Sequence, residues 1–431
     1  MARPSPKPSE LGLASRRAAL DVVRSALERR GGLDEALAGP AMAALEPRDR
    51  SFARALAMTV LRRRGELDRA LAARLSRPPP EAVMALLRLG AAQALHMEVA
   101  GHAAVATTVE LAEADRTARK FKGLVNAVLR GLLREPPQAP PPEALAPDWL
   151  YARWRAAYGE AAARAVAAVI AEEPATDLTP REAAEAPALA PLLEAEVLPG
   201  PTLRTRRGGD VADWPGFADG RWWVQDASAA VAARLLAPAP GAAVLDLCAA
   251  PGGKALQLAA AGARVTALDR SAARLKRLEE NLARTGLQAE IVVADAAAWE
   301  DARRFDAILL DAPCSATGTF RRHPDVLWAA RPGDIARLAA LQARLLASAA
   351  DRLRPGGRLV YCVCSLEPEE GEAQIEALLR ARPDLRPDPA AAGEAGAPEA
   401  SLRPDGSLRI LPHHRPGGTD GFFVARLVRL P

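Results

Sequence analysis

Cysteine, lysine and aromatic residues are scarce in this chain of 431 residues. Its four cysteines are too few to hold such a length together through disulfides, and none has the spacing of a zinc site. We therefore expect no metal and a reducing, cytoplasmic environment. The sequence also lacks an uninterrupted apolar run of about 18 residues and an apolar segment behind its basic start, so neither a membrane span nor a signal peptide is expected.

Only five of the 57 basic residues are lysine, at positions 7, 120, 122, 254 and 276. Since arginine is used almost everywhere else, each remaining lysine is a candidate for a specific role. The net charge of +4 permits a nucleic-acid partner, but an arginine-rich composition alone accounts for it equally well. With 49% hydrophobic residues, the chain is neither disordered nor fibrous.

The N-terminal third is predicted to be an all-α bundle. Across residues 1–135, Ala, Leu, Val and Arg recur at three- and four-residue spacing, without the alternation typical of strands. Residues 136–148 are predicted to be a linker, because the six prolines between Glu135 and Pro147 cannot continue a helix.

The rest of the chain is predicted to be a small connecting, RNA-binding subdomain at 149–225 and an α/β domain at 226–431. The first contains Arg204 close to two further arginines, a candidate RNA contact. In the second, short apolar runs alternate with helical stretches, which is typical of a Rossmann-like parallel sheet. The chain end reads as a terminal hairpin, and the Pro/Gly/Ala-rich insertion at 383–406 is expected to be mobile.

One amphipathic stretch near the end of the bundle is strongly basic. Arg119, Lys120 and Lys122 lie at the start of RKFKGLVNAVLRGLLRE. Two interpretations fit: the solvated face of a bundle helix, or a surface for the phosphates of RNA.

The first predicted strand of the α/β domain runs into the turn DLCAAPGGK, residues 246–254. Its glycines let the backbone approach a ligand, but it is neither G-x-G-x-x-G nor a Walker loop, which argues against dinucleotide and nucleoside triphosphate phosphates. The next two strands end in Asp269, placed for a ribose, and Asp295, placed for an adenine. A nucleoside without phosphate, such as S-adenosylmethionine, fits these carboxylates. A generic sheet with polar strand ends is the alternative.

Three of the four cysteines fall at the carboxyl ends of adjacent predicted strands. Cys314 follows Asp311 in LLDAPCSATG, and Cys362 and Cys364 face the same side because they are two apart on one strand. Carbon 5 of cytosine accepts a sulfonium methyl group only after a thiolate adds to carbon 6. An acid at N3 and N4 stabilises the charge that develops. The cysteines and Asp311 supply the thiol and the acid that this reaction requires. The alternative is that each cysteine is a buried structural thiol, which is the default for a single cysteine.

The chain resembles the RNA cytosine-C5 methyltransferases of the Nol–Nop–Sun family from about Trp149 to Leu430. The resemblance is carried by DLCAAPGGK, LDRSAARLKRLEENLARTG, DAPCSATGTFRRHPD, YCVCSLEPEEGE and DGFF. The bundle is similar to the NusB-type antitermination fold, which implies an RNA-binding domain. The combination implies methylation of a cytosine in small-subunit (16S) ribosomal RNA, with S-adenosylmethionine as methyl donor and no metal.

The resemblance implies roles for individual residues. Cys364 is the nucleophile, Cys314 assists product release, and Asp311 contacts the target cytosine with Lys254 beside it. The remaining cofactor contacts fall on Asp269 at the ribose, Asp295 at the adenine, and a loop around the methionine part. That loop comprises Cys248, Ala249, Ala250, Pro251, Gly252, Gly253 and Lys254, with Asp311 beside it.

RNA phosphates are expected at Arg321, Arg322 and His323, which follow the Cys314 turn, in addition to the basic stretch of the bundle. The chain departs from the family pattern at Val363, where Thr is usual, and Cys362 adds a thiol that is not usual there.

Alternatives from other classes stay open. A DNA cytosine-C5 methyltransferase would use Pro313–Cys314 as its active pair, but the chain has no E-N-V segment, and the thiols of the fifth strand would be unexplained. An amino-methyltransferase would need an aromatic residue where Cys314 stands. A non-catalytic RNA-binding assembly factor would not need the thiol and carboxylate set. A monomer is the default expectation.

Overall fold

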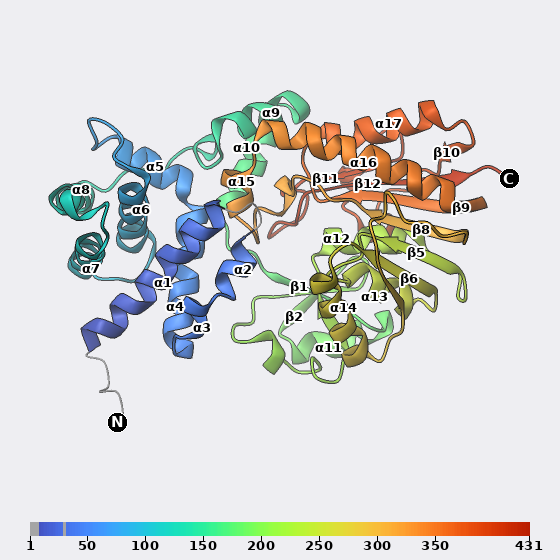
Figure 1. Cartoon of the computed structure of the whole chain (residues 1–431), viewed down its shortest axis with the longest axis horizontal. Helices are drawn as coiled ribbons and strands as arrows, with labels where there is room; N and C mark the ends of the chain where they lie inside the picture. Colours follow the sequence, from blue (N-terminus) through green and yellow to red (C-terminus); the bar gives the residue numbers. More distant parts are fainter. Residues whose placement is uncertain (1–7, 29–31) are drawn as a thin grey trace. The chain divides into compact units, whose positions relative to one another are not determined.

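The computed structural model describes residues 8–28 and 32–431. The chain divides into two compact units (Figure 1). One comprises the described residues up to Glu172 together with Phe320–Ala330, and the other comprises Glu173–Thr319 and Arg331–Pro431. The predicted fold class, a helical part followed by a Rossmann-like α/β part, is confirmed. The division falls at other residues than the four predicted segments, because the helices of 149–172 belong to the first unit.

The described residues of the first unit form helices and no strands. The helices are α1 (Pro8–Glu28), α2 (Leu33–Leu37), α3 (Pro40–Ala43), α4 (Pro47–Arg62), α5 (Arg64–Ala72), α6 (Glu81–His96), α7 (Gly101–Ala114), α8 (Lys122–Arg134), α9 (Asp148–Tyr158), α10 (Glu160–Ala168) and α15 (Asp325–Ala329).

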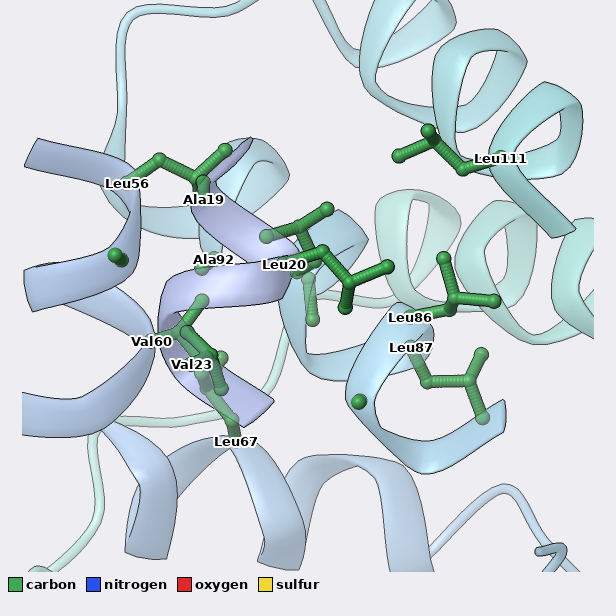
Figure 2. Close-up of a cluster of buried hydrophobic side chains, with 14 of the residues drawn as sticks. Ala19, Leu20, Val23, Leu56, Val60, Leu67, Leu86, Leu87, Ala92 and Leu111 are labelled. Carbon is green, nitrogen blue, oxygen red and sulfur yellow. The ribbon is translucent and has the colours of Figure 1, made fainter. Parts of the chain in front are cut away.

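The core of this unit is built from Ala, Leu and Val at helical spacing. Figure 2 shows side chains from several helices, among them Leu20, Val60 and Leu86, meeting in one buried cluster. The helix α8 illustrates the pattern, since its apolar stripe is buried and its basic residues face outward. The stripe comprises Val125, Val128, Leu129 and Leu132.

The segment Phe320–Ala330 belongs to the helical unit although it follows the Cys314 turn directly in sequence. The ring of Phe320 stacks on Trp154 of α9 at 6.0 Å between centroids. Trp328 Nε1 donates a hydrogen bond of 3.0 Å to the carbonyl oxygen of Leu61 in α4. These contacts hold the segment against helices that lie far away in sequence.

The second unit begins with a small antiparallel sheet in the order β2-β3-β1-β4. Its elements are β1 (Thr176–Pro180), α11 (Ala186–Leu192), β2 (Ala195–Leu198), β3 (Thr202–Thr205) and β4 (Trp222–Val224). Arg204, a candidate RNA contact from the sequence, is instead buried and forms a two-pronged ion pair with Asp177, at 2.7 and 2.8 Å. This internal pairing removes Arg204 from the surface.

The large sheet has the strand order β10-β12-β9-β8-β5-β6-β7, with β11 paired to β12. Its strands are β5 (Ala243–Leu247), β6 (Arg264–Asp269), β7 (Glu290–Val293), β8 (Phe305–Asp311), β9 (Leu353–Val363), β10 (Leu385–Pro387), β11 (Leu408–Ile410) and β12 (Phe422–Arg429). The five from β5 to β9 are parallel, as the sequence predicts, and β12 joins β9 antiparallel.

Helices cover both faces of this sheet (Figure 1). One face packs against α12 (Ala227–Leu236), α13 (Gly253–Ala260) and α14 (Ala272–Thr285). The other packs against α16 (Pro332–Arg352) and α17 (Glu372–Ala381). Because the parallel strands are covered twice, they read as short apolar runs rather than as alternating ones.

The terminal hairpin is confirmed, since β11 and β12 pair antiparallel. The expectation of a mobile insertion at 383–406 is not supported. Leu385 pairs with Arg429 in the sheet, and Ala390 and Ala397 are buried in its core. Small side chains let this segment lie close against the sheet, although its composition resembles that of a loop.

Candidate active site

The candidate site lies at the carboxyl ends of the parallel strands. The chain enters the sheet at β5, extends through β6 and β7 on one side, and continues through β8 and β9 on the other. The point between β5 and β8, where the direction of winding reverses, is where open α/β sheets bind ligands. The loops that follow these strands carry the residues singled out in the sequence.

The loop after β5 is shaped by its main chain. Cys248 adopts φ +63°, Gly252 adopts φ +112°, and the bond from Ala250 to Pro251 is cis. A Cβ atom at Gly252 would lie 2.4 Å from Leu278 Cδ1, so only glycine fits there. A left-handed backbone at a residue other than glycine, as at Cys248, gathers at ligand sites, and here the loop leads into the N-terminus of α13.

Two of the predicted carboxylates border a cavity of about 340 Å³ beside this loop. Asp269 is buried at the end of β6 and accepts hydrogen bonds from the backbone N–H groups of Ala250, at 3.2 Å, and Ser271, at 2.9 Å. Asp295 is exposed beyond β7. Cys248 and Pro313 also line the cavity, so the ends of strands β5 to β8, or the loops that follow them, all contribute to it. Its volume is within the range of small-molecule pockets.

Asp246 is a site residue to which the sequence assigned no role. It lies in β5, is fully buried, and neither carboxylate oxygen has a hydrogen-bond partner in the described part of the chain. Burial raises its pKa to about 8. A buried, unsatisfied acid is costly unless a ligand compensates for it. The available signal was the polar residue inside an apolar strand, AVLDL.

Lys254 and Asp311 are brought together from two different strand ends. Lys254 Nζ donates to Asp311 Oδ2 at 2.7 Å, and it lies 5.3 Å from the ring of Phe422 in the DGFF segment. Burial by itself would lower the pKa of the Lys254 ammonium group. The attraction and hydrogen bond of Asp311 have the larger effect, so the pKa is raised. Cys362 Sγ, fully buried, lies 3.5 Å from Asp311 Oδ1, and burial raises its pKa.

The two cysteines assigned to catalysis lie against each other. Cys314 Sγ is 3.4 Å from Cys364 Sγ, and both side chains are half-buried. The hydrogen bond with Cys364, together with burial, raises the pKa of Cys314 well above its ordinary value. Cys362 and Cys364 pack on the same side of the sheet, as predicted from their spacing. The protein therefore places a thiol pair beside a lysine–aspartate pair.

A buried polar cluster next to the thiols was missed at the sequence level. It comprises Ser315, Thr317, Gln342, Ser365 and Glu370. The acidic run EPEEGE reads as a solvated loop, because glutamate is rarely buried. The repeated Cys-Ser pairs, Cys314–Ser315 and Cys364–Ser365, were the signal that could have pointed to it.

The residues expected to meet RNA have different environments. Arg119, Lys120 and Lys122 are exposed, and Lys122 pairs with Glu113 at 2.8 Å. Arg321 is only 1% exposed, so the expected phosphate contact is not supported and we withdraw Arg321 from the RNA-facing set.

The other two residues that follow the Cys314 turn are only partly accessible. Arg322 and His323 are half-buried. His323 Nδ1 is 3.8 Å from Asp34 Oδ1, and burial lowers the pKa of the histidine.

The structure also bears on metals and membranes. In residues 8–28 and 32–431, no group of three or more His, Cys, Asp or Glu side chains is arranged to hold a metal ion. None of the helices in the described part of the chain combines the length and the apolar character needed to cross a membrane.

Solved structures share the fold. The protein solved as PH0851 covers 99% of both chains with a TM-score of 0.77 at 24% identity. A methyltransferase homologue from Pyrococcus horikoshii covers 70% of this chain and 98% of its own, with a TM-score of 0.54 at 26% identity. NSun6 from the same organism, solved with SFG, covers 66% of this chain and 98% of its own, with a TM-score of 0.57 at 20% identity.

Sequence comparisons identify the family. The family model "16S rRNA methyltransferase RsmB/F" matches residues 233–428, and the NusB family model matches residues 13–134. Ribosomal RNA small subunit methyltransferase B of Xanthomonas campestris is 39% identical over 435 residues, covering 97% of this chain and 98% of the relative. The protein of that name from Sodalis glossinidius is 37% identical over 416 residues, covering 91% and 93%.

The site fits the cofactor of this family. The strained loop, the cavity and the acids at the strand ends suit a nucleoside that carries no phosphate. With its NusB-like and RsmB/F-type parts in one chain, the protein belongs to the ribosomal RNA small subunit methyltransferase B family and depends on S-adenosylmethionine.

Proposed function

We propose that this protein methylates carbon 5 of a cytosine in small-subunit ribosomal RNA, and that Cys364 forms a transient bond to carbon 6 of the base. The observation that carries the proposal is the pair of thiols, 3.4 Å apart, at the sheet edge where Lys254 binds Asp311 at 2.7 Å. Methylation of an exocyclic oxygen or nitrogen would not need two thiols.

Cys364 acts as the nucleophile. Its sulfur, as thiolate, adds to carbon 6, and the electron pair of the 5,6 double bond moves so that carbon 5 becomes nucleophilic. S-adenosylmethionine supplies the methyl group that carbon 5 accepts. A base then removes the carbon 5 proton, and the electron pair of that C–H bond restores the double bond as the bond from carbon 6 to sulfur breaks.

Asp311 and Lys254 stabilise the charge that develops on the ring. In this proposal the carboxylate of Asp311 accepts from the exocyclic N4–H group, and Lys254, which donates to Asp311 Oδ2, supplies the positive charge that offsets the negative charge developing on the ring. A buried, preorganised ion pair of this kind stabilises a transition state without reorganising water. Cys314 assists release, because its thiol lies 3.4 Å from the Cys364 sulfur and can give that sulfur a proton as the bond to carbon 6 breaks.

The test uses 16S ribosomal RNA, S-adenosylmethionine with a labelled methyl group, and two variants. Cys364→Ala is expected to lose both methyl incorporation and any covalent RNA adduct. Cys314→Ala is expected to retain a covalent RNA adduct that survives a denaturing gel, because release is impaired. Nucleoside mass spectrometry should find 5-methylcytidine at the full level only in RNA treated with the wild-type protein, and not in RNA treated with either variant.

The reverse pattern would refute the assignment of roles. An adduct with Cys364→Ala and none with Cys314→Ala would make Cys314 the nucleophile, as in the DNA cytosine-C5 methyltransferases. Normal turnover by Cys364→Ser would end the covalent proposal altogether.

The RNA is proposed to contact the helical unit through Arg119, Lys120 and Lys122. The three side chains are exposed at the first residue of α8 and in the turn just before it, where phosphates would be attracted to their charge. The target base must leave its stack to reach the thiols, so a loop or helix end is the expected location.

A further inference from the structure

Glu370 is a buried carboxylate that the chemistry above does not use. It lies in the turn Pro368–Glu370 between β9 and α17, and its side chain is fully buried. An ionised carboxylate is almost never fully buried unless hydrogen bonds from the protein replace those that it made with water. The partners of Glu370 therefore show what the residue is for.

Both oxygens of Glu370 accept hydrogen bonds from neutral groups. Oε1 accepts from the backbone N–H of Ser315 at 2.9 Å and from Gln342 Nε2 at 3.1 Å. Oε2 accepts from Ser365 Oγ at 2.6 Å and from Ser315 Oγ. In the described part of the chain no cation pairs with this carboxylate. Apart from the bond from Gln342, its hydrogen bonds therefore hold two serines, Ser315 and Ser365.

Each of these serines directly follows a cysteine of the thiol pair. Ser315 follows Cys314 in the turn after β8, and Ser365 follows Cys364 at the end of β9. The two serine hydroxyls also lie 3.0 Å from each other. One carboxylate thus joins the two segments at the position next to each sulfur.

A second connection lies three residues further along the turn. The backbone N–H of Gly318 donates to the carbonyl oxygen of Cys364 at 3.0 Å, and Gly421 N–H donates to Gly318 oxygen at 2.8 Å. The turn is thus fixed at Gly318 by main-chain contacts and at Ser315 by Glu370. Between these two points, Ala316 adopts φ +57° and Thr317 Oγ1 accepts from the backbone N–H of Leu366 at 3.0 Å. Without Glu370, Ser315 would lose its hydrogen bonds to this carboxylate, and the part of the turn nearest to Cys314 would be less constrained.

We propose that Glu370 is a positioning residue that sets the distance between the Cys314 and Cys364 sulfurs by binding the serine after each cysteine. The inference rests on the proposed function, since it matters only if both thiols act on the same base. Proton transfer between them needs contact, and a displacement of about 1 Å costs on the order of a hundredfold in rate.

The test variant is Glu370→Gln, which keeps the shape but replaces one acceptor oxygen by an NH2 group that cannot accept from a serine. We expect kcat for ribosomal RNA methylation to fall about tenfold or more, with KM for S-adenosylmethionine within about twofold of wild type. Covalent RNA adduct should accumulate as in Cys314→Ala, because the releasing thiol is misplaced. A role only in stability would not produce an adduct.

The matched control is Glu376→Gln, an exposed glutamate on α17, which should match the wild type in every readout. If Glu370→Gln does not fold, judged by its thermal melting, Ser315→Ala takes its place, with the same adduct and a smaller fall in kcat expected.

Three results for Glu370→Gln would overturn the inference. The variant could retain the wild-type kcat, or it could raise KM for S-adenosylmethionine while kcat stays unchanged. It could also fold and turn over slowly without accumulating a covalent RNA adduct. Failure of the proposed function looks different. In that case Cys314→Ala itself gives no adduct, or the wild type forms no 5-methylcytidine.

Discussion

The two halves of the sheet edge are built in different ways. On the side of β5, β6 and β7, the main chain forms the site, through the positive φ angles of Cys248 and Gly252 and backbone donors to Asp269. On the side of β8 and β9, side chains form it, as thiols, an ion pair and a buried cluster of hydroxyls. In the proposed reaction, one half provides a shape for the cofactor and the other provides reactive groups for the base.

Because of this difference, substitutions in the two halves are expected to impair different steps of the reaction. A change in the first half should weaken cofactor binding, and a change in the second should slow the chemical step. Lys254 belongs to both halves, because its main chain lies at the end of the cofactor loop and its ammonium group binds Asp311.

The largest effect is expected from Lys254→Met. The substitution leaves the Asp311 carboxylate without its cation and removes a charge from the transition state, so kcat should fall about a hundredfold or more. Breaking a buried pair on one side also costs about 3 kcal/mol of stability. Single-turnover methylation and thermal melting measure the two effects. Lys276→Met, an exposed lysine on α14, is the control. If Lys254→Met lost only cofactor affinity, Lys254 would belong to the first half alone.

An intermediate effect is expected from Gly252→Ala. A Cβ atom there would collide with Leu278, and φ +112° costs about 1–3 kcal/mol for a residue other than glycine. The dissociation constant of S-adenosylmethionine should rise about tenfold, while kcat at saturating cofactor changes little. Calorimetric titration measures the affinity. Gly333→Ala, where an added Cβ meets no atom within 4 Å, should bind normally. A fall in kcat with normal affinity would contradict the division into halves.

The smallest effect is expected outside both halves, at Arg119, Lys120 and Lys122. Replacing all three by Gln should leave kcat unchanged and weaken RNA binding in proportion to the charges removed. If each contacts one phosphate, the slope of log K against log salt should fall by about 2–3. Binding assays at several salt concentrations measure it, with Arg380→Gln on α17 as the control. An unchanged slope would remove these residues from the RNA surface.

Much of the fold could be predicted because its elements follow local patterns. The strands from β5 to β9 appear as apolar runs, and a residue of the candidate site lies at the end of each strand or within two residues after it. The shared face of Cys362 and Cys364 follows from the two-residue repeat of a strand. The buried stripe of α8 follows from the helical repeat in the same way.

The failures of prediction at charged residues have a common cause, which is that charge indicates exposure only on average. Arg321 lies in a basic stretch that resembles an exposed one in composition, yet it is buried with the segment that packs on α4 and α9. Glu370 and Arg204 are buried for a similar reason, since distant residues supply their hydrogen-bond and ion-pair partners. Nothing within a few positions of these residues reveals those partners.

The sequence by itself determined the order of strands and helices, the glycine-bearing cofactor loop and the residue types available for chemistry, because these depend on neighbours along the chain. Only the tertiary structure decided that Cys314 and Cys364, fifty residues apart, come within 3.4 Å, and that Lys254 reaches Asp311. The packing of β5, β8 and β9 side by side brings their ends together, and burial there decides which charges must find partners inside the protein.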